Sequence, residues 1–342
     1  MKLPTLTSYV RYAAALTATA LLAACGSDSH EPTPAAPVSI LATAQATADL
    51  SSLVAAVQFA SDNNDLVNLL GSAGTLTVFA PSNVAFDKLA QTLTGNANAK
   101  GPDILVPANK ALVKAVLQYH VLTSVVKAAD IPSGKAITPA AGGFFKIDLV
   151  AAKPVITDGR NRKANLTTTD IAASNGVVHL IDAVLLPADK TIVQTAIASM
   201  PEFSSLVAAL QFASDGDDLV TTLSGAGPFT VFAPTNAAFD ALAKELTGSA
   251  TATGPDLLTP ANKALLRSVL TYHVVAARVL KADISLNASI TTVQGKTFVI
   301  QATATGVAIT DGRNRVSNIA ATDVLNSNGV IHVIDKAILP PL

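Results

Sequence analysis

The chain repeats itself with a shift of 153 residues. The stretch "TVFAPSNVAFDKLA" begins at Thr77, and "TVFAPTNAAFDALA" begins at Thr230. Without any gap, 77 of the 139 positions from 49 to 187 are identical to the positions 153 residues later. A solenoid repeat has about 20 to 50 residues, whereas a period of about 150 is the size of a whole domain. The sequence therefore predicts two copies of one globular unit, each with its own hydrophobic core.

The composition of the 342 residues suits two packed domains and excludes one class of partner. Half of the residues are hydrophobic and only 14% are charged, so each unit has enough apolar side chains for a sizeable core. The formal net charge is −1, and no block of lysines and arginines is present. Because nucleic-acid binding depends on clustered positive charge, we expect no nucleic-acid partner.

Residues 1–25 are predicted to be a secretion signal. Lys2 and Arg11 precede an uncharged run at 12–24 that consists mostly of alanine and leucine. As a helix this run spans about 20 Å, which is too short for about 30 Å of bilayer hydrocarbon. It ends at Cys25, the single cysteine of the chain, which can form no internal disulfide.

The tetrad "LAAC" that ends at Cys25 resembles the lipobox of bacterial lipoproteins. That resemblance implies that lipid is attached to Cys25 and anchors the protein to a membrane. Such an anchor is stable because two or more acyl chains stay inserted in the bilayer, whereas a single chain binds it reversibly. Gly26 stands where an aspartate would indicate inner-membrane retention, so the resemblance favours the outer membrane or cell surface, with the periplasm as the alternative. The other interpretation is an ordinary secreted protein with an incidental cysteine.

The rest of the chain divides into a tether and the two copies. Residues 26–38 are polar and proline-rich, which predicts an extended tether that reaches about 40 Å at about 3.1 Å per residue. We place the first domain at 39–187 and the second at 191–342. Only "ADK" at 188–190 joins them, and so short a join restricts relative motion of the domains.

Helical patterns come first within a copy. Residues 51–60 have the apolar spacing of a helix, and 108–118 read as another helix. "TLTVFAP" is an apolar run stopped by Pro81, which predicts a buried strand. Ser82 or Asn83 then caps a helix that ends before Gly95. The inward face of that helix is predicted to carry Phe86, Leu89, Ala90 and Leu93.

Strand patterns dominate the second half of each copy. "FFKIDLV", "PVIT", "ANLTT" and "NGVVHLID" have strand-like composition, and "DGRNR" at 158–162 reads as a turn between two of them. Helices followed by strands, rather than an alternation of the two, predict the α+β class.

These motifs resemble the fasciclin domain. The first signature region of the family resembles "TVFAPSNVAF", its central Tyr-His resembles Tyr119-His120, and its second signature region resembles "NGVVHLIDAVLLP". The second copy repeats all three, and the resemblance covers essentially everything after the tether. It implies two tandem wedge-shaped β-sandwiches with helices packed along one edge. It also implies surface-anchored or extracellular modules that work in adhesion, with no enzymatic activity and no cofactor.

The resemblance also implies candidate binding residues. The Tyr-His motif of the family corresponds to Tyr119, His120, Tyr272 and His273, and its Asp-Ile motif corresponds to Asp130, Ile131, Asp283 and Ile284. Both motifs are implicated in adhesion through cell-surface receptors. The alternative is a structural role, with the aromatic ring and the isoleucine in the core.

The "DGRNR" turn supplies a second set of candidates. Arg160 and Arg162 are predicted to project from it, as are Arg313 and Arg315 from its repeat. Guanidinium groups bind carboxylates and sulfates and stack on sugar rings, so we expect an acidic polysaccharide as one possible ligand. Two such loops gain avidity if both reach the same polymer. The alternative is a solvated turn whose arginines pair with nearby aspartates or carbonyl groups.

No motif predicts catalysis or a metal site. The two histidines of each copy are 59 residues apart with no obvious third ligand, and the alternation in "VVHLID" puts His179 on the face of Val177 and Ile181. No G-x-S-x-G elbow or phosphate-binding glycine loop occurs. We therefore expect neither an enzyme nor a bound metal.

We interpret the chain as a non-catalytic surface adhesion protein whose partner is a cell-surface or matrix protein or an acidic polysaccharide. One alternative is a periplasmic carrier of a small apolar or lipid ligand, which an internal cavity lined by Phe and Leu would favour. The other is a hydrolase of surface glycans, which requires two carboxylates about 5 to 10 Å apart in a cleft. The candidates for that pair are Asp130, Asp158, Asp170 and Asp182.

Overall fold

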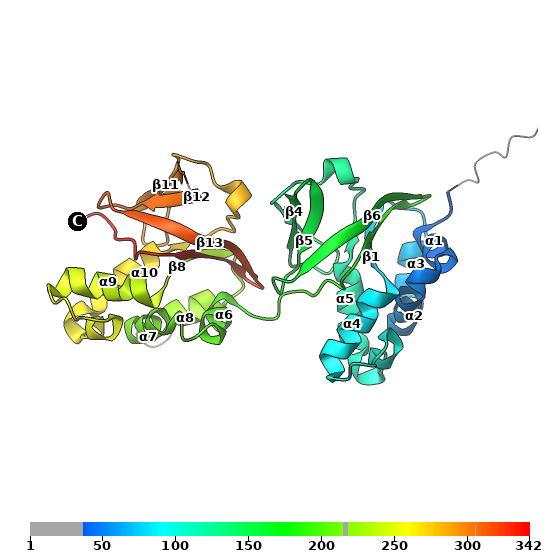
Figure 1. The fold of residues 1–342 in the computed structure, drawn as a ribbon, viewed down its shortest axis with the longest axis horizontal. Helices are drawn as coiled ribbons and strands as arrows, with labels where there is room; N and C mark the ends of the chain where they lie inside the picture. The colour runs from blue at the N-terminus through cyan, green and yellow to red at the C-terminus, as the bar shows by residue number, and fades with distance from the viewer. Residues whose placement is uncertain (1–36, 215–217, 305) are drawn as a thin grey trace, which may run out of the picture. The chain divides into compact units, whose positions relative to one another are not determined.

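The structure is a computed structural model that describes residues 37–214, 218–304 and 306–342 (Figure 1). The predicted signal segment, Cys25 and the tether up to residue 36 lie outside the described residues. Residues 37–342 group into one compact unit, which contains both copies.

Apart from η1, which has no counterpart among the described residues of the second copy, the two copies contain the same kinds of element in the same order. The first copy consists of α1 (Ile40–Ala46), η1 (Ala48–Leu50), α2 (Ser51–Ala60), α3 (Asp65–Gly71), β1 (Leu76–Pro81), α4 (Asn83–Thr94), η2 (Gly101–Ile104), η3 (Pro107–Asn109), α5 (Lys110–Tyr119), β2 (Val121–Leu122), η4 (Ala128–Asp130), β3 (Ala136–Ile137), β4 (Phe145–Val150), β5 (Lys153–Thr157), β6 (Lys163–Ala173) and β7 (Gly176–Ile181).

The second copy consists of α6 (Ile192–Ala198), α7 (Ser204–Ala213), α8 (Asp218–Ser224), β8 (Phe229–Pro234), α9 (Asn236–Thr247), η5 (Gly254–Leu257), η6 (Pro260–Asn262), α10 (Lys263–Tyr272), β9 (Val274–Val275), η7 (Lys281–Asp283), β10 (Ser289–Thr291), β11 (Thr297–Thr303), β12 (Gly306–Thr310), β13 (Val316–Asn326) and β14 (Gly329–Ile334). Helices precede the long strands in both copies, which confirms the predicted α+β class.

Each copy builds one seven-stranded sheet. Its order in the first copy is β2-β1-β7-β6-β5-β4-β3, and the second copy has the same order with its own strands. The pair β1 and β7 is parallel, while the other neighbours are antiparallel. The first residues of β6 pair with β5 and its last residues pair with β7, with two register shifts in the β6–β7 ladder. Because bulges bend a strand, the predicted sandwich is realised as a single sheet that curls at β6.

The capping signals placed the central helix correctly. The Ser82 hydroxyl accepts a hydrogen bond from the Ala85 N–H at the start of α4, and Gly95 ends the helix with φ +68°. Phe86, Leu89 and Ala90 are buried as predicted. The prediction for Leu93 was wrong, since its side chain is 53% exposed in the last turn of the helix.

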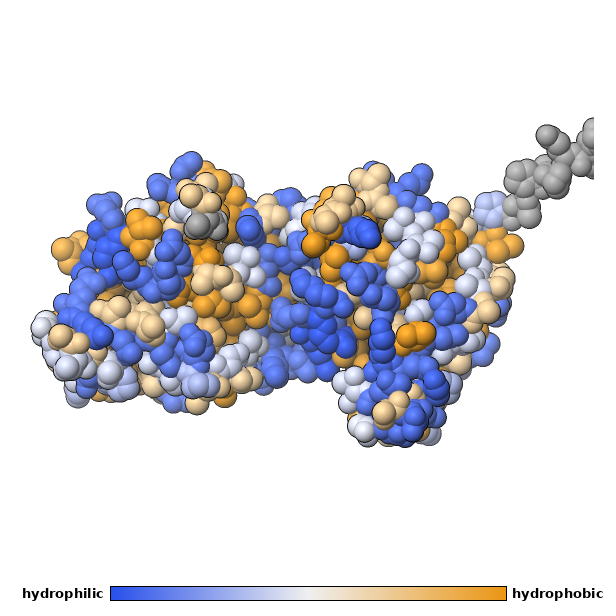
Figure 2. Space-filling view, in the orientation of Figure 1, coloured by the Kyte–Doolittle hydropathy of each residue, from blue (hydrophilic) through white to orange (hydrophobic). Residues whose placement is uncertain are grey.

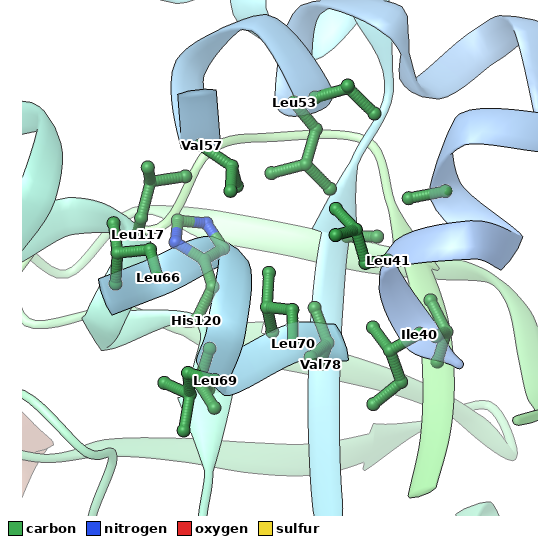
Figure 3. A pocket seen from close by; sticks show the side chains of 15 residues that line it. Ile40, Leu41, Leu53, Val57, Leu66, Leu69, Leu70, Val78, Leu117 and His120 are labelled. Atoms are coloured by element: carbon green, nitrogen blue, oxygen red, sulfur yellow. The ribbon is translucent and has the colours of Figure 1, made fainter. Parts of the chain in front are cut away.

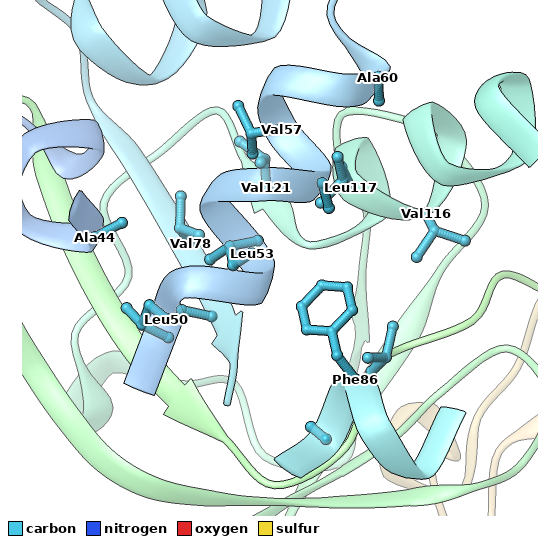
Figure 4. Close-up of a cluster of buried hydrophobic side chains, with 14 of the residues drawn as sticks. Ala44, Leu50, Leu53, Val57, Ala60, Val78, Phe86, Val116, Leu117 and Val121 are labelled. Carbon is cyan, nitrogen blue, oxygen red and sulfur yellow. The ribbon is translucent and has the colours of Figure 1, made fainter. Parts of the chain in front are cut away.

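The main hydrophobic cores lie within the copies. In the first copy, one cluster packs α2, α4 and α5 against the sheet (Figure 4), and a second cluster around Phe79 and Phe145 fills the curl of the sheet. The second copy has its own two clusters at the equivalent positions. A small fifth cluster contains Phe144 from the first copy together with Leu280, Leu325 and Val330 from the second. The prediction of two separate interiors is therefore confirmed, with one minor shared contact.

In the described part of the chain, no single helix has the length and hydropathy needed to cross a membrane. One pair of helices, Ile40–Ala46 and Ala48–Ala60, passes that test only when taken together, and it is bent by 109°.

Candidate functional site

The Tyr-His pair of the first copy is part of the core. Tyr119 is fully buried, and its hydroxyl donates a hydrogen bond of 2.6 Å to the Phe144 carbonyl. His120 donates from Nδ1 to the Val116 carbonyl (2.6 Å) and accepts at Nε2 from the Leu185 N–H (2.9 Å). Burial lowers the pKa of His120 to about 4, so its ring is neutral at pH 7.

The second copy repeats this arrangement. The Tyr272 hydroxyl donates to the Thr297 carbonyl (2.6 Å), and burial raises its pKa to about 12. His273 donates from Nδ1 to the Val269 carbonyl (2.7 Å), accepts at Nε2 from the Ile338 N–H (3.0 Å), and has its pKa lowered by burial to about 4. None of the four side chains is accessible to a partner, so the structure places them in the scaffold and not on a binding surface.

The other histidines hold a bend in the sheet. His179 accepts at Nδ1 from the Asp170 N–H (3.1 Å) and donates from Nε2 to the Val126 carbonyl (2.9 Å). Asp170 has φ +60° and lies in the irregular part of β6, so the imidazole satisfies a backbone donor that the bulge leaves unpaired. His332 makes the equivalent contacts with Asp323 and Val279. No group of three or more His, Cys, Asp or Glu that could hold a metal is found among the residues that the structure describes.

The Asp-Ile motifs divide between surface and core. Asp130 is exposed, while Ile131 is partly buried against the cluster around Phe79. In the second copy, Ile284 packs in the same way, and Asp283 forms a 3.0 Å ion pair with Lys135 of the first copy. The isoleucine of each motif therefore belongs to the scaffold, and Asp283 is engaged in an ion pair.

A buried carboxylate organises the "DGRNR" turn. Asp158 is 1% exposed, and it accepts hydrogen bonds from the backbone N–H groups of Arg160 (3.0 Å), Arg162 (2.9 Å) and Leu186 (3.0 Å). The Arg162 guanidinium binds the same carboxylate through Nε (3.0 Å) and an NH2 group (2.7 Å) and also reaches the Val184 carbonyl. With these partners the turn is rigid, and Arg162 is largely committed to its own domain.

Arg160 is held more loosely than Arg162. Its Nε lies 3.4 Å from the Pro187 carbonyl oxygen, and an NH2 group lies 3.3 Å from Asp189. These distances are at the long end for such contacts, and one third of the side chain is exposed.

The second copy repeats these contacts within the turn. Arg315 is bound by Asp311 and also by Glu245 (2.7 Å), while Arg313 contacts the Pro340 carbonyl (3.1 Å). The two turns have the same sequence, but the acidic side chain outside the turn pairs with Arg160 in the first copy and with Arg315 in the second.

Asn161 of the first turn contacts the second copy. Its side-chain amide accepts from the Leu325 N–H (2.6 Å) and donates to the Leu325 carbonyl (3.0 Å). Nearby, Lys146 and Asp323 form a 2.6 Å ion pair with side chains that are only 10% and 3% exposed. The Arg278 guanidinium lies 4.3 Å from the centroid of the Phe144 ring.

Several residues of these contacts between the copies differ between the repeats. The second copy has Thr297 and Val299 at the positions equivalent to Phe144 and Lys146. The first copy has Lys127 and Ala172 at the positions equivalent to Leu280 and Leu325. The sequence comparison shows these differences, but only the structure identifies them as one contact surface.

A polar crevice lies beside this contact. It has a volume of about 340 Å³ and is lined by Gly159, Arg160, Asn161, Asp189, Lys190, Thr195 and Leu325. The lining therefore combines the turn of the first copy, the short join and the start of the second copy. Sequence reasoning missed Asp189, Lys190 and Thr195, because nothing in the sequence indicates that the join folds against the turn.

Two apolar pockets of the first copy are small. The pocket in Figure 3 has a volume of about 30 Å³, and the labelled side chains around it are aliphatic except for His120. The second, between α4 and α5, has about 50 Å³ and includes Phe86, Leu93 and Leu112. Sites for drug-sized ligands have about 300 to 1,000 Å³, so neither pocket as it stands accommodates a lipid chain.

The visible surface mixes polar and apolar residues. Figure 2 shows hydrophilic and hydrophobic residues interleaved on the face in view. The exposed large hydrophobics, such as Val84, Leu149 and Val150 (57% each), are spread over several elements. Scattered apolar residues of this kind are normal on a protein surface and do not by themselves indicate a site.

Several known proteins are similar to this chain in sequence. A protein of Synechocystis sp., sll1483, is 42% identical over 154 residues, which is 44% of this chain and 74% of that protein. Human periostin is 27% identical over 297 residues, which is 85% of this chain but only 30% of periostin. The cell surface glycolipoprotein MPB83 of Mycobacterium bovis is 34% identical over 150 residues, 44% of this chain and 60% of its own.

A solved structure and a family model also match. The structure is a FAS1 domain pair from the insect cell adhesion molecule Fasciclin I, with 20% identity and a TM-score of 0.40 over 84% of this chain and 97% of the other. The model of the fasciclin domain matches residues 48–187 and again residues 201–340. The two matches together cover most of the chain and one of them falls on each repeat, so this protein belongs to the fasciclin domain family as a tandem pair.

Proposed function

We propose that this chain is a non-catalytic adhesion protein of the bacterial cell surface that binds an acidic polysaccharide through its arginine turns. The observation that carries the proposal is the buried Asp158 carboxylate, which organises the turn while leaving one third of the Arg160 side chain exposed. Because the turn backbone is already fixed, less entropy is lost when the exposed guanidinium pairs with a carboxylate, which favours recognition of an acidic sugar.

The roles of the other polar groups support binding over catalysis. His120 and His273 have backbone partners at both ring nitrogens. The pKa of each is lowered to about 4, so both rings are neutral at pH 7. Asp182 accepts two hydrogen bonds of 2.7 Å from Asn165 across the β6–β7 ladder. Side chains bound in this way stabilise the fold and are not available as a nucleophile or a general acid.

The cell-surface location rests on the lipobox-like tetrad at Cys25, and one relative is described as a cell surface glycolipoprotein. If Cys25 carries the anchor, the variant Cys25→Ala is released into the soluble fraction, while the unmodified chain sediments with membranes and incorporates labelled palmitate. Equal fractionation of the two proteins would refute the anchor without bearing on ligand binding.

Retention on a polygalacturonate column tests the ligand. The double variant Arg160→Ala with Arg313→Ala is expected to lose at least half of the retention of residues 39–342. The matched control removes two exposed lysines, Lys153→Ala with Lys296→Ala, and changes the net charge equally without touching the turns. Unchanged retention of the arginine variant, or an equal loss in the lysine control, would refute recognition through the turns.

A further inference from the structure

We propose that the polar crevice between the first "DGRNR" turn and the second copy binds one carboxylated sugar unit of the polysaccharide. This inference rests on the proposed function and makes it more specific. It assigns the strongest contact to a site that occurs once in the chain, at the join, and not equally to both turns.

The walls of the crevice are fixed by contacts on three sides. Asn161 is bound to both the N–H and the carbonyl of Leu325. The Lys190 carbonyl accepts from the Ser327 N–H (2.9 Å), which fastens the join to the second copy. The backbone of Ala188 lies so close to Gly159 that a Cβ at that position would overlap it, so the join also packs tightly on the turn.

Two cationic side chains line the crevice. The ion pair between Arg160 and Asp189 is long at 3.3 Å and solvent-exposed, so it is weak. A ligand carboxylate can therefore take the place of Asp189 at the guanidinium at low cost. No ion pair holds the Lys190 ammonium within residues 37–214, 218–304 and 306–342, and it is exposed beside the same opening.

The size and polarity of the crevice define the class of ligand. Its volume of about 340 Å³ is at the lower end of the range of about 300 to 1,000 Å³ for small-molecule sites, which suits a single sugar unit. The Asn161 amide and the Thr195 hydroxyl also line the crevice; both already donate, to the Leu325 carbonyl and to Asn326, so they offer a sugar hydroxyl an oxygen that accepts. A carboxylate on the sugar would meet Arg160 and Lys190, and its hydroxyl groups would meet the polar wall.

The second copy provides a matched comparison within the same molecule. Arg313 is the repeat equivalent of Arg160, and its Nε contacts the Pro340 carbonyl as that of Arg160 contacts the Pro187 carbonyl. The lining residues Lys190 and Thr195 belong to the join and the start of the second copy, so the crevice includes only the first turn. Arg160→Ala and Arg313→Ala thus remove the same side chain from similar turns, one inside the crevice and one outside it.

The experiment measures binding of galacturonic acid and polygalacturonate to residues 39–342 by calorimetry and by column retention. We expect Arg160→Ala and Lys190→Ala each to weaken binding at least fivefold, and Arg313→Ala to change it less than twofold. All variants should keep the melting temperature of the parent, because each side chain lies at the surface of an intact turn.

The possible outcomes separate this inference from the proposed function. Equal losses in Arg160→Ala and Arg313→Ala would overturn the crevice while keeping recognition through both turns. No loss in either single variant or in the double variant would overturn both proposals. Equally strong binding of dextran sulfate, with the same loss in every variant, would show general attraction of anions and overturn the assignment to a carboxylated sugar.

Discussion

The buried ion pair between Lys146 and Asp323 gives the sharpest test of the contact between the copies. The Lys146 ammonium lies 2.6 Å from the Asp323 carboxylate, and the side chains are 10% and 3% exposed. Burial is the largest single effect and would lower the pKa of Lys146, but the hydrogen bonds and charge attraction to Asp323 and Asp148 together outweigh it, and the net pKa is raised. The ammonium is therefore charged at pH 7 and is paired with a nearly inaccessible carboxylate.

Lys146→Met removes the ammonium and keeps much of the apolar stem. It leaves Asp323 buried with one strong remaining donor, the Lys281 N–H at 2.7 Å. Breaking a buried pair on one side costs about 3 to 5 kcal/mol, and the surviving hydrogen bond places the expected loss near the lower end, at about 3 kcal/mol. Asp323→Asn should cost about 2 kcal/mol, since asparagine tolerates the φ of +60° at this position.

The assay is urea unfolding followed by circular dichroism at pH 7, applied as a double-mutant cycle. The free energy of unfolding of the variant with both Lys146→Met and Asp323→Asn should fall by about 2 kcal/mol less than the sum of the two single losses. The reason is that the double variant leaves no buried charge without its partner. An exposed lysine serves as control, and Lys153→Met should change the free energy of unfolding by less than about 0.5 kcal/mol. Single losses below about 0.5 kcal/mol, or strict additivity, would show that the two copies do not form this contact in solution.

Three further predictions concern the scaffold. The pKa of His120 and of His273 is about 4 in the folded state and about 6.5 when unfolded, so the unfolded chain binds more protons between these pH values. The free energy of unfolding should therefore be at its full value above pH 6.5 and fall towards pH 4 by about 3 kcal/mol per histidine. A flat pH dependence of urea unfolding in this window would contradict the burial of the two rings. Gly176→Ala should lower the free energy of unfolding by more than about 3 kcal/mol in the same assay, since φ is +152° and a Cβ would overlap the Leu76 carbonyl oxygen. A loss below about 1 kcal/mol would mean that the parallel strands β1 and β7 are spaced differently. Tyr119→Phe should lower the free energy of unfolding by about 1 to 2 kcal/mol, because it removes a buried hydrogen bond, and should leave polygalacturonate retention unchanged. A loss of retention without a loss of stability would show that Tyr119 takes part in binding.

Much of the fold was predictable because its signals are local. The helix α4 was predicted from Ser82 to Gly95 by its two caps, and each cap acts through the few residues beside it. Leu93 was assigned to the wrong face, because helical spacing alone does not say how much of the last turn the neighbouring elements cover. The helix α1 at Ile40–Ala46 and the two-residue strand β2 were missed, since segments so short have no measurable periodicity.

The candidate site was only partly predictable. The sequence identified Arg160 and its turn, but it did not indicate that Asp158 would be buried or that Arg162 would fold back onto it. It gave the Tyr-His pairs a possible surface role, whereas Tyr119 is fully buried and its hydroxyl is bound to the backbone. Burial depends on residues that are distant in the chain, so a motif read by itself cannot assign a side chain to the core or to the surface.

The sequence by itself determined that this protein is a tandem pair of like domains, because a repeat with 77 identities lets the same side chains meet the same neighbours twice. Its motifs, and not the repeat, indicated the fasciclin family. Only the tertiary structure decided what distinguishes the copies. Residues such as Lys146 and Asp323 are 177 positions apart, and their attraction depends on a distance and a degree of burial that exist only after both domains have folded. The crevice beside them has the same origin, since packing brings the second copy against a turn whose sequence is the same as that of its repeat.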